Sequence, residues 1–194
     1  MEITNYNVYN LENAIKASKY PMASDTTSKD SEITKTVRKL GAMERGSGHD
    51  NFLHGILVSF DLTCSNKMWV EFQRYHFADI VSSQSTMHRI TNLLEEDVFN
   101  EYVTNETKRA IYQCWRQYNL DPTTQNYLKL LYNIPSGIEL TAHIVTNYGQ
   151  LKTMWYQRHN HRLPEWRKFC DWILTLPRFC ELTGIEKEKN NVDN

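Results

Sequence analysis

Residues 134–158 read IPSGIELTAHIVTNYGQLKTMWYQR, and both the expected fold and the expected site depend on how this segment folds. Its rhythm predicts one long helix from about residue 138 to residue 158. At about 100° per residue, one stripe of such a helix carries Asn147, Leu151, Met154 and Arg158. That stripe would normally face the interior, where an amide and a guanidinium need partners. We therefore expect Asn147 and Arg158 to be satisfied inside the protein or offered to a ligand.

Length, composition and charge predict an ordinary globular chain. The 194 residues are most simply one domain, and 40% hydrophobic residues with five tryptophans suffice for a full core. The 22 basic and 23 acidic residues give a formal charge of −1, so no overall field attracts nucleic acid or an anionic membrane. Any phosphate must therefore be held by a local site. Residues 186–194, EKEKNNVDN, are expected to be a solvated polar tail.

The cysteines and the hydropathy pattern indicate a reduced, non-membrane environment. The four cysteines are scattered without C-x-x-C spacing, which argues against a zinc site and against a secreted disulfide framework. No positive-then-apolar leader and no apolar run of about 18 residues is present. We therefore expect a cytoplasmic protein without a membrane span.

Periodicity elsewhere predicts few strands and much helix. A short strand and a helical turn occupy residues 1–20, and a helix follows over 31–43. GILVSFDLTC, residues 55–64, alternates as a strand with one buried face, and Ser65 or Asn66 can cap the helix after it. The fold class is therefore α/β (α+β).

The second half of the chain is expected to be mainly helical. One or two helices fill residues 91–119, and another begins with Asp121 as its N-cap and Pro122 at the first helical position. A last helix over residues 163–182 is interrupted at Pro177.

Spacing in the C-terminal third resembles that of a known family. Asn147 lies twelve residues after Pro135, Leu151 four residues later, and Arg158 eleven residues after Asn147. A histidine and a glutamate four residues apart follow as His161 and Glu165. In these features the chain resembles the flavin-dependent thymidylate synthases, the ThyX family. The resemblance implies a single ThyX-like catalytic domain over residues 1–185, with a small, mostly antiparallel sheet flanked by long helices.

The N-terminal half resembles the same family more loosely. GHDNFLHGILVSFDL, residues 48–62, is similar to a family segment leading into a strand and makes His54 the family histidine. RYHFADIVSSQSTMHR, residues 74–89, corresponds to the family signature R-H-R-x-x-S-x-N-E-x-S-x-R. Arg74 and Arg89 stand at its two ends, but the spacing is three residues too long and Ser-Gln replaces Asn-Glu. The chain is thus identified as a divergent member.

The resemblance implies a chemistry as well as a fold. It implies a homotetramer with active sites between subunits, FAD as cofactor, dUMP as substrate, and NADPH and methylenetetrahydrofolate as co-substrates, giving dTMP. Making C5 of uracil nucleophilic requires stabilising negative charge on the base, which a positioned guanidinium can do. We therefore expect Arg158 to be catalytic, because its planar fork stays charged and bonds two acceptors at once.

Two sets of binding residues follow from the resemblance. The serine-rich loop offers hydroxyls, backbone N–H groups and a guanidinium to a monophosphate. The expected substrate-binding residues are Ser83, Gln84, Ser85, Arg89 and Arg158. The expected cofactor-binding residues are His54, Arg74, His76, Asn147 and His161, and no metal ligand is expected.

Other interpretations of these residues remain open. Arg158 could form a buried ion pair with Glu165 or Glu139, and the serine cluster could be an ordinary turn or N-cap. The departures in the signature also allow a catalytically inactive ThyX-like protein that binds nucleotides or protein partners. A helical DNA-binding domain over residues 163–179 is disfavoured by the neutral charge. An Asn- and Lys-rich composition suits a bacteriophage or an AT-rich genome.

Overall fold

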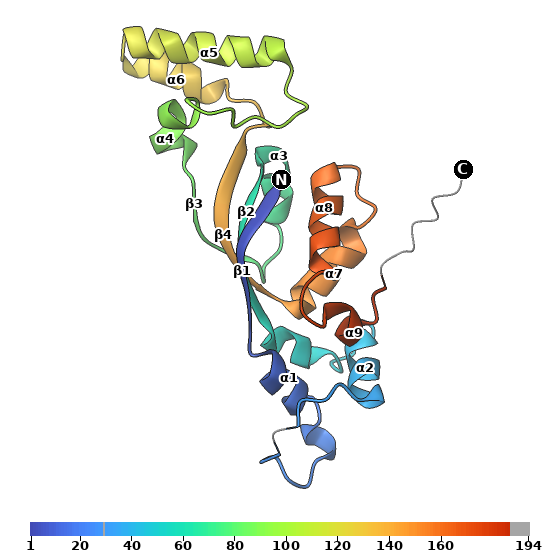
Figure 1. Ribbon diagram of the computed structural model, residues 1–194. Coiled ribbons are helices and arrows are strands. Elements are labelled where there is room, and N and C mark those ends of the chain that lie inside the picture. Colours follow the sequence, from blue (N-terminus) through green and yellow to red (C-terminus); the bar gives the residue numbers. More distant parts are fainter. Residues whose placement is uncertain (29, 187–194) are drawn as a thin grey trace, which may run out of the picture. The chain divides into compact units, whose positions relative to one another are not determined.

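The computed structural model describes residues 1–28 and 30–186, so the expected polar tail lies almost wholly outside the described residues. Its strands are β1 (Glu2–Tyr9), β2 (Leu57–Ser65), β3 (Asp79–Ser83) and β4 (Glu139–Asn147) (Figure 1). Its α-helices are α1 (Leu11–Ala17), α2 (Lys35–Ala42), α3 (Asn66–Phe72), α4 (Thr86–Leu93), α5 (Asn105–Leu120), α6 (Thr124–Tyr132), α7 (Tyr148–Arg158), α8 (Pro164–Ile173) and α9 (Phe179–Thr183). Two 3₁₀ helices, η1 (Tyr20–Met22) and η2 (Asn51–Gly55), complete the described elements.

The strands form one small antiparallel sheet, as predicted, and the structure gives their order as β1-β2-β4-β3. Strand β2 shows why a buried sheet face forms here, because its alternate residues Val58, Phe60, Leu62 and Cys64 are all fully buried. Apolar residues two positions apart share one face of a strand, so this alternation places all four in the core. The prediction of a half-buried strand is confirmed.

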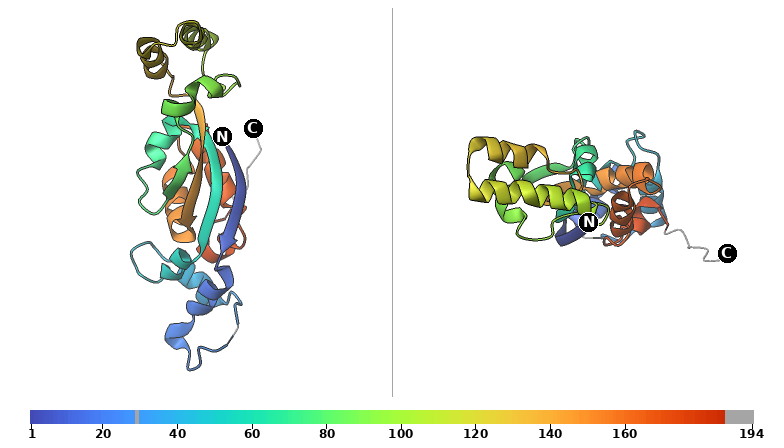
Figure 2. Two further views of the ribbon diagram at one scale, coloured as in Figure 1. Left: turned by 90° about the vertical axis from the view of Figure 1, so that its left-hand side faces the viewer. Right: turned by 90° about the horizontal axis from the view of Figure 1, so that it is seen from above.

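The described residues form two compact units. The first comprises Met1–Thr4, Asp61–Arg74 and Ile80–Ile144. Within it, α5 packs side by side with α6 (Figures 1 and 2). Its apolar core is formed by residues of these helices and their neighbours, namely Ile90, Leu94, Phe99, Ile111, Leu130 and Ile138.

The second unit comprises, among the described residues, those of 5–60, Tyr75–Asp79 and 145–186. Here α7 packs against η2 and α8, while α2 packs against α9. Leu151 and Met154 on α7 are fully buried, so the apolar half of the predicted stripe does face the core. Helix α8 contributes Trp166 and Phe169 to the same interior.

The prediction of one continuous helix over residues 138–158 is wrong. Residues Glu139–Asn147 form strand β4, and helix α7 begins only at Tyr148. Within β4, Ala142, Ile144 and Thr146 are buried at every second position, which is the period of a strand. β-Branched residues are common in strands, and the segment TAHIVT is rich in them. Pairing with neighbouring strands therefore prevailed over the apolar spacing that also suited a helix.

Several helices begin just after a residue whose side chain caps them, and one predicted cap is wrong. Ser65 caps α3 as predicted, its Oγ accepting from Met68 N at 3.2 Å. Asp121 is not the N-cap of α6, because Thr123 takes that position and accepts from Asn126 N at 3.3 Å. The interruption at Pro177 is confirmed, since α8 ends at Ile173 and α9 begins at Phe179.

All four cysteines are free thiols, which agrees with the absence of a disulfide framework. Across residues 1–28 and 30–186, none of the helices is both long and apolar enough to cross a lipid bilayer.

Candidate functional site

Two residues predicted to contact a cofactor, His54 and Asn147, meet in the second unit. His54 lies in η2, and Asn147 is the last residue of β4. His54 Nδ1 lies 3.1 Å from Asn147 Oδ1, which also accepts a hydrogen bond from Gln150 N at 2.9 Å and so caps α7. A carbonyl oxygen only accepts, so His54 Nδ1 carries the proton and Nε2 is the acceptor in the neutral ring.

The first turn of α7 fits closely beneath the His54 ring. A Cβ atom added to Gly149 would lie 2.7–2.9 Å from three atoms of that ring, closer than real Cβ contacts. Only glycine therefore allows the helix to approach His54 this closely. Phe77 lies edge-on to His54 with ring centroids 6.3 Å apart, and 59% of Phe77 is exposed. The histidine is thus held by a helix cap on one side and flanked by an exposed aromatic ring.

Arg158, the predicted catalytic residue, is the last residue of α7 and is held by aromatic side chains. Its Nε donates to the Tyr75 hydroxyl at 2.9 Å, and that hydroxyl donates to Gln157 Oε1 at 2.9 Å. The guanidinium carbon lies 5.0 Å from the ring centroid of Trp166 and 5.8 Å from that of Tyr75. Both distances are within cation–π range. Tyr75 and Trp166 therefore help to orient the guanidinium at the end of α7.

The two other predicted histidines of this unit differ in their surroundings. His161 Nδ1 accepts from Leu163 N at 3.2 Å, and its ring lies edge-on to Trp166 with centroids 6.3 Å apart. Its backbone N donates to Arg158 O at 2.9 Å, which links it to the end of α7. His76 is exposed in the segment between α3 and β3. His161 therefore belongs to the surroundings of Arg158.

The predicted substrate loop lies in the first unit and is described by itself. Gln84 N donates to Thr141 O, and Thr141 N donates to Gln84 Oε1, both at 2.9 Å. The side chain of Gln84 thus continues the hydrogen bonding between β3 and β4. Ser83 ends β3, and Ser85 occupies the N-cap position of α4 without a side-chain cap bond.

The two predicted arginines of the first unit are exposed on its surface. Arg89 lies on α4, where its backbone N donates to Ser85 O at 3.0 Å. Arg74 follows α3. Binding of a substrate phosphate by the loop and of a cofactor by Arg74 stays a prediction.

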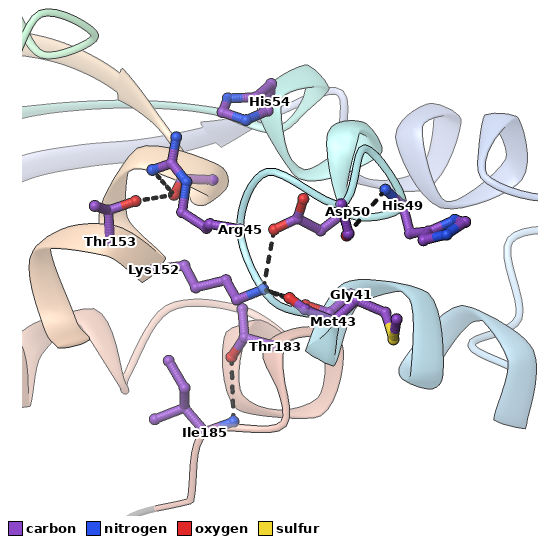
Figure 3. Close-up of polar contacts among 12 residues, drawn as sticks. Gly41, Met43, Arg45, His49, Asp50, His54, Lys152, Thr153, Thr183 and Ile185 are labelled. Carbon is purple, nitrogen blue, oxygen red and sulfur yellow. Dashed lines mark hydrogen bonds and ion pairs between the residues drawn. The ribbon is translucent and has the colours of Figure 1, made fainter.

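Sequence reasoning missed a buried ion pair next to His54. Lys152 is only 1% exposed, and its Nζ lies 3.0 Å from Asp50 Oδ2, itself on a residue only 3% exposed. The same ammonium donates to Gly41 O at 2.9 Å and to Met43 O at 2.6 Å (Figure 3). The sequence carried only a weak signal, because Lys152 directly follows the apolar Leu151 but Gln150 and Thr153 nearby are polar.

A second missed residue, Arg45, lies in the loop between α2 and η2. Its Nη1 donates to Gly149 O at 3.2 Å, and Thr153 Oγ1 donates to the same carbonyl at 3.1 Å. Arg45 and Gly149 are 104 residues apart, so no local motif could have joined them. Arg45, His54 and Gly149 thus converge on the first turn of α7.

No protein-family model and no curated protein matches the chain. Solved structures do share its fold. The flavin dependent thymidylate synthase ThyX from Helicobacter pylori, complexed with FAD and dUMP, gives a TM-score of 0.75 at 16% identity, covering 94% of this chain and 97% of that chain. Another structure of ThyX from Helicobacter pylori, with FAD and dUMP, gives 0.69 at 16% identity with the same coverage.

A third similar structure is the UMP/dUMP methylase PolB from Streptomyces cacaoi, bound with 5-Br dUMP. It gives a TM-score of 0.61 at 12% identity, covering 93% of this chain and 89% of that chain. The chain therefore has the ThyX fold, and the predicted fold class is confirmed.

Proposed function

We propose that this chain methylates dUMP or a close pyrimidine nucleotide at C5, as a divergent flavin-dependent enzyme of the thymidylate synthase type. The observation that carries the proposal is Arg158, oriented by two aromatic rings at the end of α7 in a ThyX fold. The structures with this fold include proteins solved with FAD and dUMP and a methylase solved with 5-Br dUMP. Both point to a pyrimidine nucleotide as the substrate class.

Arg158 would activate the base electrostatically. Carbon–carbon bond formation at C5 requires electron density to move toward that carbon, with negative charge developing on the N3/O4 edge. A guanidinium aimed at this edge stabilises the charge, and pre-orientation by Tyr75 and Trp166 avoids reorganisation during the reaction. The mechanism needs no protein nucleophile, which agrees with the absence of any cysteine in a Pro-Cys-His context in the sequence.

The groups around His54 suit an isoalloxazine ring. His54 Nε2 can accept a hydrogen bond, the Asn147 amide nitrogen can donate, and the exposed Phe77 ring can pack against a flat apolar surface. A bound flavin would supply the hydride that reduces the transferred carbon to a methyl group. His54 and Asn147 would hold the ring, and Asn147 would remain fixed by its bond to Gln150 N. The resemblance adds methylenetetrahydrofolate as carbon donor, NADPH as reductant and a homotetramer to the proposal.

Two measurements on the purified protein test the proposal. The visible absorption bands of oxidised flavin would report the cofactor, and release of tritium from C5-labelled dUMP would report replacement of the C5 hydrogen. We expect Arg158→Ala to lower tritium release at least about 100-fold with flavin binding retained, as on loss of one charge-stabilising donor. Arg116→Ala, at an exposed position on α5, is the matched control and should leave the rate unchanged. Full activity of Arg158→Ala would remove this residue from the mechanism.

A second candidate function is nucleotide binding without catalysis. The engagement of Gln84 Oε1 by Thr141 N favours it, because this part of the signature loop then serves the sheet. A colourless protein that binds dUMP without releasing tritium would support this alternative.

A further inference from the structure

We propose that Arg45 binds a phosphate group of the ligand held at His54, an inference that rests on the proposed function. Arg45 reaches the first turn of α7 from the loop between α2 and η2, with Nη1 3.2 Å from Gly149 O. Gly149 is the residue on which the His54 ring packs. The Arg45 guanidinium and the His54 ring thus both lie at Gly149, and Figure 3 shows the two side chains in one close-up. A ligand contacting His54 would therefore have a cation close by.

The charge of Arg45 is not neutralised within the part of the chain that the structure describes. Its hydrogen bond there goes to a neutral carbonyl, and no ion pair joins it to a carboxylate. Other arginines do have such partners, as in the pairs Arg38–Glu181 and Arg178–Glu181. The buried acid of the same loop, Asp50, is already paired with Lys152. Arg45 is exposed and, although Glu44 precedes it in sequence, it forms no ion pair among the described residues, so its guanidinium suits an anionic ligand.

The loop that carries Arg45 is fixed on both sides of it. Lys152 bonds to Met43 O before Arg45 and to the Asp50 carboxylate after it, so both flanks are attached to α7. Gly46 and Gly48 adopt positive φ angles of 90° and 76°, which allow the tight return between these two attachments. The guanidinium is also anchored at one nitrogen, so less side-chain freedom is lost on binding. These features pre-organise Arg45 for a two-pronged contact with phosphate oxygens.

Phosphate oxygens could come from the flavin dinucleotide or from the pyrimidine monophosphate. Both present the same chemistry to a guanidinium, so binding experiments must separate them. The phosphate-free relatives of these ligands, riboflavin and deoxyuridine, keep the rings and lack the charge. A contact with phosphate changes the affinity for FAD or dUMP and not the affinity for the matching phosphate-free compound.

The test is equilibrium binding of FAD, riboflavin, dUMP and deoxyuridine to the full chain and to Arg45→Gln. Glutamine keeps a polar amide with a hydrogen-bond donor but carries no charge. We expect the affinity for one phosphorylated ligand to fall roughly tenfold to 100-fold, typical of a lost charged hydrogen bond. The affinity for the matching phosphate-free compound should change by less than about twofold, because that compound has no charged group for Arg45 to bond. A loss for FAD assigns the diphosphate, and a loss for dUMP assigns the monophosphate.

Three results would overturn the inference. Equal losses for a phosphorylated ligand and its phosphate-free relative would mean that Arg45 only supports the loop. Unchanged affinity for both phosphorylated ligands would mean that Arg45 contacts neither. If the unaltered protein binds neither FAD nor dUMP, the proposed function itself fails and the inference fails with it. Arg116→Gln, the same substitution at an exposed position, should change none of the four affinities.

Discussion

Asp50→Asn perturbs the buried ion pair with almost no change in side-chain volume. Asp50 and Lys152 are 3% and 1% exposed, so the substitution leaves the Lys152 ammonium inside the protein without its counter-charge. Removing one partner of a buried pair typically costs about 3–5 kcal/mol. Gly41 O and Met43 O still accept from Lys152, and the new amide can accept as well. We therefore expect the lower end of that range, about 3 kcal/mol.

Thermal unfolding followed by circular dichroism measures this effect. For a chain of this size about 1 kcal/mol corresponds to 2–4 °C, so the Tm should fall by roughly 6–12 °C. Asp97→Asn is the matched control, because it makes the same substitution in an ion pair with Lys108 whose Asp97 side chain is 69% exposed. That change should cost less than about 1 kcal/mol. Equal Tm shifts in the two variants would refute the reasoning from burial.

Three further predictions concern α7 and its surroundings. Gly149→Ala should destabilise the protein by about 1–3 kcal/mol and displace His54, lowering flavin affinity; an unchanged Tm would contradict the close approach. Asn147→Ala removes the helix cap and should lower the unfolding free energy in urea by about 1–2 kcal/mol, whereas no change would show that the cap contributes nothing. Burial raises the pKa of Cys170 from 9.0 to about 12 and raises that of Tyr148, so the unfolded chain loses these protons first. Stability should therefore fall as pH rises above about 9, and less steeply in Cys170→Ala; identical pH profiles would exclude a contribution from the thiol.

Local patterns predicted the elements whose signals depend on near neighbours in sequence. The alternation around Phe60 identified β2, and Ser65 was recognised as a helix cap because its hydroxyl bonds a backbone N–H three residues ahead. Asn147 and Arg158 lie at the two ends of α7, Asn147 as its N-cap and Arg158 as its last residue. The wrong assignment of β4 arose because its apolar positions fit a helical period as well, and only strand pairing decides between the two.

Contacts between distant residues could not be predicted in this way. Lys152 and Asp50 are 102 residues apart, and Arg158 and Tyr75 are 83 apart. No rule of sequence spacing predicts either contact, because the two residues of each pair come together only when the whole chain folds. His54 and Asn147 were named separately by the family resemblance, and the structure adds that they bond each other. The sequence thus indicated individual site residues, but the residues that contact them could be identified only from the tertiary structure.

The junction between β4 and α7 contains no connecting residue, because the strand ends at Asn147 and the helix begins at Tyr148. Inserting a single residue there would rotate the whole helix by about 100° and shift it by about 1.5 Å along its axis. Lys152 would then lose its contact with Asp50, and Arg158 would at the same time lose its contact with Tyr75. Insertions or deletions at this junction should therefore prevent folding. The exposed loop over residues 23–28 should accept insertions.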